Sequence, residues 1–594
     1  MQNDGNTITP MNTDDRLNSS VQKPAGMPAN GQVTRRGFVG RLLAGAGAGA
    51  AAAAGVTLPA VTGRADAAPA PSLLSGAARA AEASRIRVAA AQAYLSQPVT
   101  AHPNNGDETR YANRIGSYSK GLPHNALGEV DPTAYNAYLK AVGSGKPQDF
   151  AAIPMGAPGG RRLVSPLSGL SYELEGADAA SFYVRPAPAF ASAERAGEMV
   201  ENYWMALLRD VPFSEYYKSD LALAAANDLS RLSDFRGPRG SFGKVTPDTL
   251  FRNITPGDTM GPYLSQFFFH PMPIGASYIE GKMQTLAPNI DFMTNYDEWL
   301  QIQRGFEPSQ DAVFDPVRRY PRNGRDIGQW VHMDLLYQAY FQAMCCLLAP
   351  ASDDPHMNGM AAPYDPNNPY LATATQDGFV TFGAPHIATL LCEVANRCMK
   401  AQWYQKWFVH RTLRPEAYAG RLHNHMNGKA SYPIGAELLN SPVLKLVRQL
   451  NQYRNQDTQS TYLLPMVFPE GSPLHPAFGS GHATVAGACV TILKAWFDEN
   501  WVIPNPVQPT PDGLGLEPYR GGWQLTVGGE LNKLASNISF GRNIAGVHWR
   551  SDAIEAMKLG EAVAISILRD QRALYCEPFN GWAFTKFDGT KVVV

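Results

Sequence analysis

The chain has 594 residues, of which 44% are apolar and 17% are charged, and its formal net charge is −1 at pH 7. This is the composition of a globular protein with enough chain to bury a large core. The balanced charge argues against a nucleic-acid-binding protein and against a basic membrane-surface protein. We therefore expect neither nucleic acid nor a membrane surface as a partner.

The first 67 residues are predicted to be a targeting segment outside the fold. A polar, disordered lead-in is followed by the pair Arg35-Arg36, an Ala/Gly-rich apolar run over 42–60 and a small-x-small cleavage site at 65–67. This order is typical of a signal peptide, and the arginine pair indicates the twin-arginine type. A membrane helix is the weaker alternative, because Pro59 interrupts the run. We expect export of the folded chain to the periplasm or the cell exterior.

The mature chain, 68–594, is predicted to be one mainly α-helical unit, with an N-terminal helical half to about residue 323 and a C-terminal half after it. The stretch 100–185 is rich in Gly and Pro and is expected to consist of loops. A short strand is expected at 521–527. Apolar residues at helical spacing predict the main helices at 77–95, 193–208, 327–348, 386–410, 482–498, 531–544 and 552–574. No segment of the mature chain is apolar and long enough to span a bilayer.

Cysteine usage gives no metal or redox motif. The sequence has no C-x-x-C pair and no Cys/His cluster with zinc spacing. We expect mostly buried free thiols, while the predicted export leaves one or two disulfides open. The six cysteines are Cys345, Cys346, Cys392, Cys398, Cys489 and Cys576.

The first chemical motif places Lys406 before the pair Arg414-Pro415, with seven residues between the lysine and the arginine. An ammonium group and a guanidinium fork are both good ligands for an oxyanion. Pro415 fits the start or end of a helix. By itself this motif is weak, because lysine and arginine near a helix end usually lie in solvent.

The second motif is His475 followed by Ser480-Gly481-His482, directly before a predicted helix. The free N–H groups and the dipole at a helix N-terminus favour an anion. Ser480 adds a hydroxyl donor, Gly481 allows close approach of the backbone, and His482 supplies an acid–base group. A serine N-cap with an incidental histidine is the alternative.

The third motif places Arg542 before His548, with Asp552 four residues further on. This spacing predicts that His548 and Asp552 share a helix face, where the carboxylate fixes one imidazole nitrogen and aims the other. A surface arginine beside a helical His–Asp pair is the alternative. Together, the three motifs predict an oxyanion pocket with three cations and a helix N-terminus.

In this composite the sequence resembles the superfamily of vanadium haloperoxidases and type-2 phosphatidic-acid phosphatases. The spacings of the lysine, arginines and histidines are similar to those of its algal-type bromoperoxidase branch. The amino-acid sequences at 199–213, 378–397 and 470–483 are similar to that branch as well. The resemblance extends over about 190–570. It implies a fold of two four-helix bundles and a vanadate cofactor.

The resemblance also implies roles for individual residues. His548 would ligate vanadium, while His482 would bond to the apical oxygen and act as acid and base. His475 occupies a position whose identity accompanies bromide or iodide preference over chloride. Trp403 would line the pocket, and Asp334, on an earlier helix, would support an active-site arginine. The residues expected to hold the vanadate oxygens are Lys406, which would also activate a bound oxygen, with Arg414, Ser480, the Gly481 amide and Arg542.

The activity implied is oxidation of bromide or iodide by hydrogen peroxide, with an organic halogen acceptor. One alternative is a phosphatase of the same superfamily that forms a phosphohistidine at His548, with His482 as the leaving-group acid. Another is an exported anion-binding or scaffold protein without catalysis, which His482 argues against. Relatives also suggest a homo-oligomer and a structural calcium ion, for which 364–368 and 376–378 offer oxygen ligands, although such loops are usually ordinary turns.

Overall fold

The computed structural model of the protein describes residues 75–594. The predicted targeting segment, 1–67, therefore lies outside the described residues. None of the helices described is both apolar and long enough to cross a membrane.

Helices dominate the regular structure of the described chain. The α-helices are α2 (Gly76–Leu95), α3 (Asp107–Arg110), α4 (Pro132–Ser144), α5 (Pro147–Ala151), α6 (Ala193–Leu208), α7 (Asp220–Arg231), α8 (Tyr296–Arg304), α9 (Gly324–Met333), α10 (Gln338–Leu348), α11 (Ala384–Tyr404), α12 (Pro415–Met426), α13 (Ala436–Leu439), α14 (Val443–Arg454), α15 (Gly481–Trp496), α16 (Val527–Ile544) and α17 (Arg550–Arg572). Short 3₁₀-helices are η2 (Pro166–Leu170), η3 (Ala179–Ser181), η4 (Phe213–Lys218), η5 (Ser241–Gly243), η6 (Pro247–Thr249), η7 (Gln266–Phe268) and η8 (Pro369–Ala372), and η9 (Gln405–His410) is a π-helix.

The strands are short and form four separate two-stranded antiparallel sheets. Their pairs are β1 (Met272–Ile274) with β2 (Ser277–Ile279), β3 (Met283–Leu286) with β4 (Phe314–Arg319), β5 (Val507–Pro509) with β6 (Leu516–Pro518), and β7 (Ala583–Thr585) with β8 (Lys591–Val593). The fold is thus mainly α-helical, as the sequence predicted. The two four-helix bundles and the division near residue 323 stay predictions.

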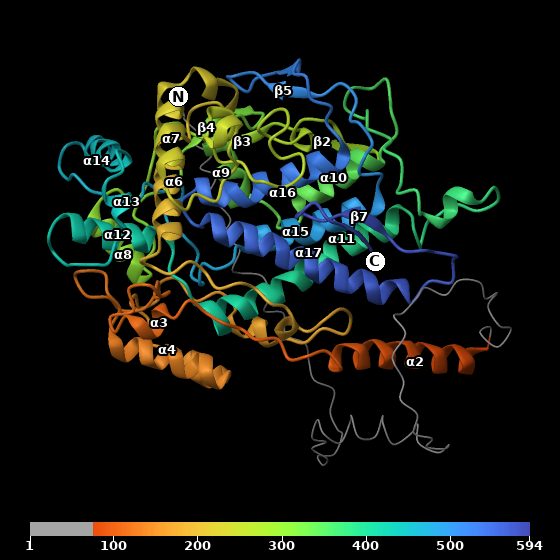
Figure 1. Cartoon of the computed structure of the whole chain (residues 1–594), viewed down its shortest axis with the longest axis horizontal. Coiled ribbons are helices and arrows are strands. Elements are labelled where there is room, and N and C mark those ends of the chain that lie inside the picture. The colour runs from red at the N-terminus through yellow and green to blue at the C-terminus, as the bar shows by residue number, and fades with distance from the viewer. Residues whose placement is uncertain (1–74) are drawn as a thin grey trace, which may run out of the picture. The chain divides into compact units, whose positions relative to one another are not determined.

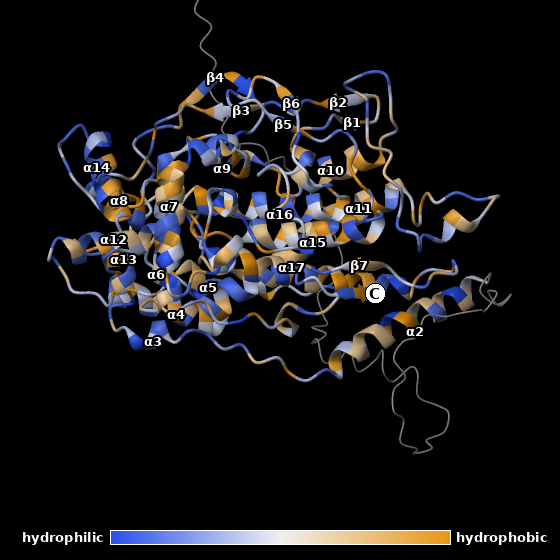
Figure 2. Cartoon of the chain, turned by 45° about the horizontal axis from the view of Figure 1, so that its top comes forward, coloured by the Kyte–Doolittle hydropathy of each residue, from blue (hydrophilic) through white to orange (hydrophobic). Residues whose placement is uncertain are grey.

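The centre of the fold is α15, which packs against α11, α16 and α17 (Figure 1). Hydrophobic residues are frequent on α11 and α15 (Figure 2). Two glycines bring α15 and α17 into close contact. A Cβ at Gly487 would lie 2.0 Å from the carbonyl oxygen of Met557, and one at Gly560 would lie 1.9 Å from that of Thr484. This contact sets the position of α15 and α17 relative to each other, and two of the three chemical motifs lie at or just before the starts of these helices.

Most predicted helices are present, but the one expected at 327–348 is wrong as a single element. The chain leaves the helix at Asp334, whose backbone is extended, and α10 begins only at Gln338. Asp334 uses its side chain to bind His482. The sequence could not show this break, because no Pro or Gly marks it and the apolar spacing continues through it.

Two other local predictions are corrected. The stretch 521–527 contains no strand, only a single bridge between Val502 and Thr526, because Thr526 instead caps α16. The expected loop region 100–185 contains the 13-residue helix α4. Asp131 caps its N-terminus, and Gly145 ends it in the left-handed conformation, at φ 62°.

Candidate active site

The three motifs, far apart in sequence, come together at one buried site. Lys406 lies on the π-helical continuation of α11, and Arg414 is the residue before α12, with Pro415 in its first turn. A π-helical turn of this kind is common at functional sites. Ser480 caps α15, and Arg542 lies in the last turn of α16. His548 follows in the short connection to α17.

His548 lies before α17 rather than on it, which corrects the predicted shared helix face. Asp552, in the first turn of α17, accepts a hydrogen bond from the backbone N–H of Trp549. Its carboxylate lies 2.7 Å from Nδ1 of His548 and accepts that N–H. Nε2 of His548 therefore carries the lone pair, and it faces Nη1 of Arg414 at 2.9 Å. Burial first, and then the charges of Arg414 and Lys406, hold the pKa of His548 well below its ordinary value. The imidazole is thus kept neutral, as a metal ligand must be.

Arg414 joins the second and third motifs. Its Nη1 donates to the carbonyl oxygen of Val547 at 2.8 Å, and its Nη2 lies 2.9 Å from Nδ1 of His475. Nε also donates to the carbonyl oxygen of His475, at 3.1 Å. The ring of Trp403 lies 4.8 Å from that of His475 and completes this side of the site.

Lys406, Arg414 and Arg542 form a buried cationic cluster. Burial lowers the pKa of Arg414 and of Arg542 to about 10 and the pKa of Lys406 well below its ordinary value. Lys406 donates to the carbonyl oxygens of Pro476 and Ala477, at 2.8 and 2.9 Å, and Arg542 to that of Val331, at 2.6 Å.

The chemistry of this cluster requires an anion. In the described part of the chain, the hydrogen bonds of its three cations go to carbonyl oxygens and imidazoles rather than to carboxylates. Nε of Arg542 is buried and has no hydrogen-bond partner among residues 75–594. Buried cations are costly unless an opposite charge compensates them. A tetrahedral oxyanion fits these donors and the neighbouring N-terminus of α15.

The N-terminus of α15 carries the acid–base candidate. Ser480 is fully buried, and His482, in the first turn, is part-exposed. Nε2 of His482 lies 3.0 Å from Oδ1 of Asp334. The expected support of an active-site arginine by Asp334 is not a hydrogen bond, because that bond goes to His482. Its negative charge nevertheless raises the pKa of Arg542, against the larger effect of burial.

A cavity of about 390 Å³ opens onto these groups and is called the active-site cavity below. Lys406, Arg414 and Ser480 are buried beside it. Sequence analysis assigned no role to two of its polar residues, His332 and Glu470, although Glu470 lies only five residues before His475. The residues that line the cavity are Val331, His332, Asp334, Leu336, Met399, Trp403, Phe468, Glu470, Gly471, Pro473, His475, Gly481, His482, Arg542 and His548.

Comparison with known proteins decides the family. The model of the VCPO second helical-bundle domain matches residues 395–575. Vanadium-dependent bromoperoxidases from Corallina pilulifera, Corallina officinalis and Ascophyllum nodosum are each 36% identical over 86% of this chain, which covers 97%, 97% and 91% of theirs. The chain belongs to the vanadium-dependent bromoperoxidase family. The homohexameric structure of the second vanadate-dependent bromoperoxidase of Ascophyllum nodosum superimposes with a TM-score of 0.82 at 33% identity, covering 90% of this chain and 94% of that one.

This vanadium-dependent haloperoxidase has no disulfide among its cysteines. All six are free thiols, and Cys345, Cys346, Cys398 and Cys489 are buried. Burial raises the pKa of the Cys345 thiol to about 11. The predicted set of mostly buried thiols is therefore confirmed.

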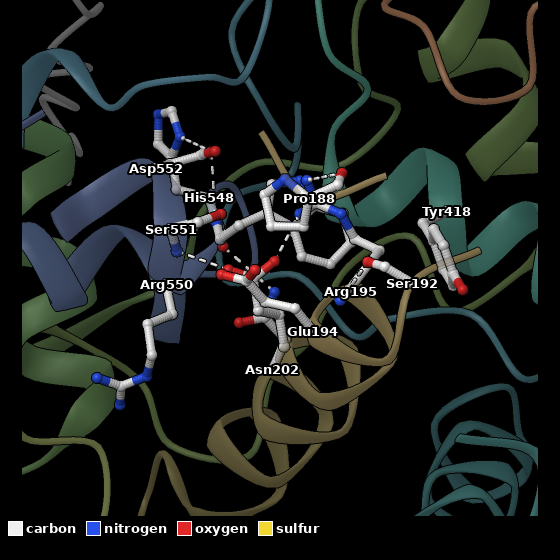
Figure 3. Close-up of polar contacts among 12 residues, drawn as sticks. Pro188, Ser192, Glu194, Arg195, Asn202, Tyr418, His548, Arg550, Ser551 and Asp552 are labelled. Atoms are coloured by element: carbon white, nitrogen blue, oxygen red, sulfur yellow. Dashed lines mark hydrogen bonds and ion pairs between the residues drawn. The ribbon is translucent and has the colours of Figure 1, made fainter. Parts of the chain in front are cut away.

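Helix α6 holds the segment that carries His548 in this haloperoxidase (Figure 3). Asn202 donates to the carbonyl oxygen of His548 at 3.2 Å, and Glu198 accepts the backbone N–H of Ser551 at 2.6 Å. Arg195 pairs with Glu198 at 2.8 Å and lies 4.1 Å over the ring of Trp549. The sequence did not predict these contacts, although its resemblance to the bromoperoxidase branch includes residues 199–213, which belong partly to α6.

We expect the substitution Glu198→Gln to destabilise the protein and to loosen the start of α17. Loss of one partner from the buried Arg195–Glu198 pair leaves an uncompensated charge, which typically costs about 3 kcal/mol. Urea unfolding followed by fluorescence measures this effect as a lower midpoint. The control Glu215→Gln removes one partner of an exposed pair with Lys218 and should leave the midpoint almost unchanged. Equal midpoints for the two variants would contradict the role assigned to Glu198.

Proposed function

We propose that this haloperoxidase oxidises bromide, or iodide, with hydrogen peroxide to a hypohalous-acid equivalent that halogenates an organic acceptor. The observation that carries the proposal is a buried cationic cluster beside the lone pair of His548, and the hydrogen bonds of these cations reach no carboxylate among residues 75–594. An anionic vanadate would neutralise that cluster and accept the imidazole as a ligand. Relatives named as bromoperoxidases support this reaction over the phosphatase alternative.

Vanadate would be held by His548 at the metal and by the cationic cluster, Ser480 and the Gly481 amide at its oxygens. When bound, it supplies a Lewis acid that activates hydrogen peroxide. The residues of the chain orient the anion and move protons. Nε2–H of His482 donates to Asp334, so the lone pair of this imidazole, on Nδ1, would take a proton from the peroxide. Lys406 and the two arginines would stabilise the negative charge on the oxygens of the bound anion.

The test is bromination of a phenolic dye by purified protein loaded with vanadate, in the presence of peroxide and with bromide as the variable. We expect activity that depends on all three. Hydrolysis of a phosphate ester without vanadate, and no bromination with it, would favour the phosphatase that acts through His548. Binding of vanadate without either activity would favour the non-catalytic alternative.

We expect vanadate to stabilise the folded protein, because it compensates the buried cations. At a vanadate concentration 100 times the dissociation constant, the stabilisation is about 2.7 kcal/mol for a ligand that binds only the folded state. Thermal unfolding with and without vanadate measures it. Sodium chloride at the same ionic strength is the control, and an unfolding temperature that vanadate leaves unchanged would contradict a built anion site.

Further proposals concern location and assembly. The Arg35-Arg36 pattern supports export by the twin-arginine route, and replacement of both arginines by lysine should hold the protein inside the cell.

The homohexameric relative supports a homo-oligomer, and light scattering of the purified protein would measure its size. A structural calcium ion at 364–368 is the third of these proposals. In that segment Asp365 already accepts the backbone N–H of Asn367, and calcium-dependent thermal unfolding tests the proposal.

A further inference from the structure

A second histidine–carboxylate pair lines the active-site cavity, apart from His482 and Asp334. Nε2 of His332, at the end of α9, lies 2.7 Å from Oε1 of Glu470 and donates to it. Each side chain is 23% exposed, and both line the cavity. The pair joins the end of α9 to the segment before α15, and both of its side chains face the space through which a substrate must pass.

The chain holds Glu470 firmly at the cavity wall. Nζ of Lys120 and Nη1 of Arg161 both donate to its carbonyl oxygen, at 2.9 and 3.1 Å. The ring of His332 stacks on Phe468 with centroids 3.9 Å apart. The guanidinium of Arg542 lies 5.3 Å from the centroid of the Phe468 ring. The backbone of Glu470 is therefore held in place, and its carboxylate is held at the cavity wall by the hydrogen bond from His332.

The charge of Glu470 matters because the substrates differ in charge. Bromide and vanadate are anions that must enter the cavity, whereas hydrogen peroxide is neutral. Although burial alone would raise it, the hydrogen bond and charge of His332 lower the pKa of Glu470. The carboxylate therefore stays ionised and repels an incoming anion, while the imidazole partly offsets that repulsion.

We propose that Glu470 and His332 are a specificity-determining pair that sets how readily anions, and halide above all, enter the active-site cavity. The carboxylate limits anion access, and the imidazole relieves that limit. The inference rests on the proposed function for its halide substrate. It goes beyond that function because neither residue belongs to the cationic cluster or to the acid–base pair.

The first test measures steady-state kinetics of the vanadate-loaded protein, with bromide and peroxide varied separately. Glu470→Gln keeps the shape and the hydrogen-bonding capacity but removes one charge, so the KM for bromide should fall about threefold to tenfold, at or below the lower limit for clefts lined by several charges. The KM for peroxide should not change. His332→Phe keeps the ring that stacks on Phe468 but loses the donor, and should raise the KM for bromide. Glu215→Gln is the control, with the same change in net charge at the surface.

The second test does not depend on turnover. Vanadate-free protein is mixed with vanadate, samples are desalted at timed intervals, and bound vanadium is measured by elemental analysis. Glu470→Gln should take up vanadate faster than wild type, and Glu215→Gln at the wild-type rate. An unchanged bromide KM, equal falls in the bromide and peroxide KM, or an unchanged uptake rate would overturn the inference. Absence of bromide oxidation by wild type would overturn the proposed function instead, and the uptake rates would still decide the charge effect.

Discussion

Replacing His548 with alanine should abolish vanadate binding while leaving the protein folded. Nε2 of His548 carries the lone pair that faces the cationic cluster, because the Nδ1–H of the same ring donates to Asp552. Loss of a group that only orients a metal ligand typically costs 10-fold to 100-fold in affinity, so we expect loss of the ligand itself to cost more than about 100-fold. Equilibrium dialysis followed by vanadium analysis measures the affinity, and haloperoxidase activity should disappear with it.

The graded control for this prediction is Asp552→Asn. The amide removes the charge that holds the imidazole tautomer but leaves the imidazole in place, so the affinity for vanadate should fall about 10-fold to 100-fold. Near-UV circular dichroism checks that both variants keep the native packing around α17. A His548→Ala protein that binds vanadate as tightly as wild type would show that the cationic cluster holds the anion without a metal–imidazole bond.

Replacing His482 with alanine should leave vanadate bound but abolish turnover, whereas His548→Ala loses the vanadate itself. His482 lies in the first turn of α15 on the cavity wall and is held by Asp334 rather than by the cationic cluster. A positioned general acid–base group typically contributes 10²-fold to 10⁴-fold, so kcat should fall by about that factor. Vanadate affinity should change little, because the main charge compensation stays in place.

The supporting variant is Asp334→Asn, which keeps a side chain of the same shape beside His482. It should lower kcat less than His482→Ala does, since the imidazole remains. Wild-type kcat in His482→Ala would reject an acid–base role and would leave proton transfer to solvent.

The long helices could be predicted from the sequence because their apolar spacing extends over several turns. The predictions for α2, α6, α15, α16 and α17 agree with the structure to within a few residues. The break at Asp334 could not be predicted, because it depends on a partner 148 residues further along the chain. The same holds for the helix α6, whose polar side chains look ordinary in the sequence and hold the start of α17 in the fold.

The sequence by itself determined the chemistry of this protein: which side chains can bind an oxyanion, and in what order three motifs present them. Only the tertiary structure decided that Lys406, Arg414 and Arg542 share one buried site. It also decided that His548 precedes its helix and that Glu470 faces the same cavity as His482. The physical reason is that residue type and spacing act locally along the chain. Charge compensation and burial depend instead on which distant segments pack together, and on how much water they exclude.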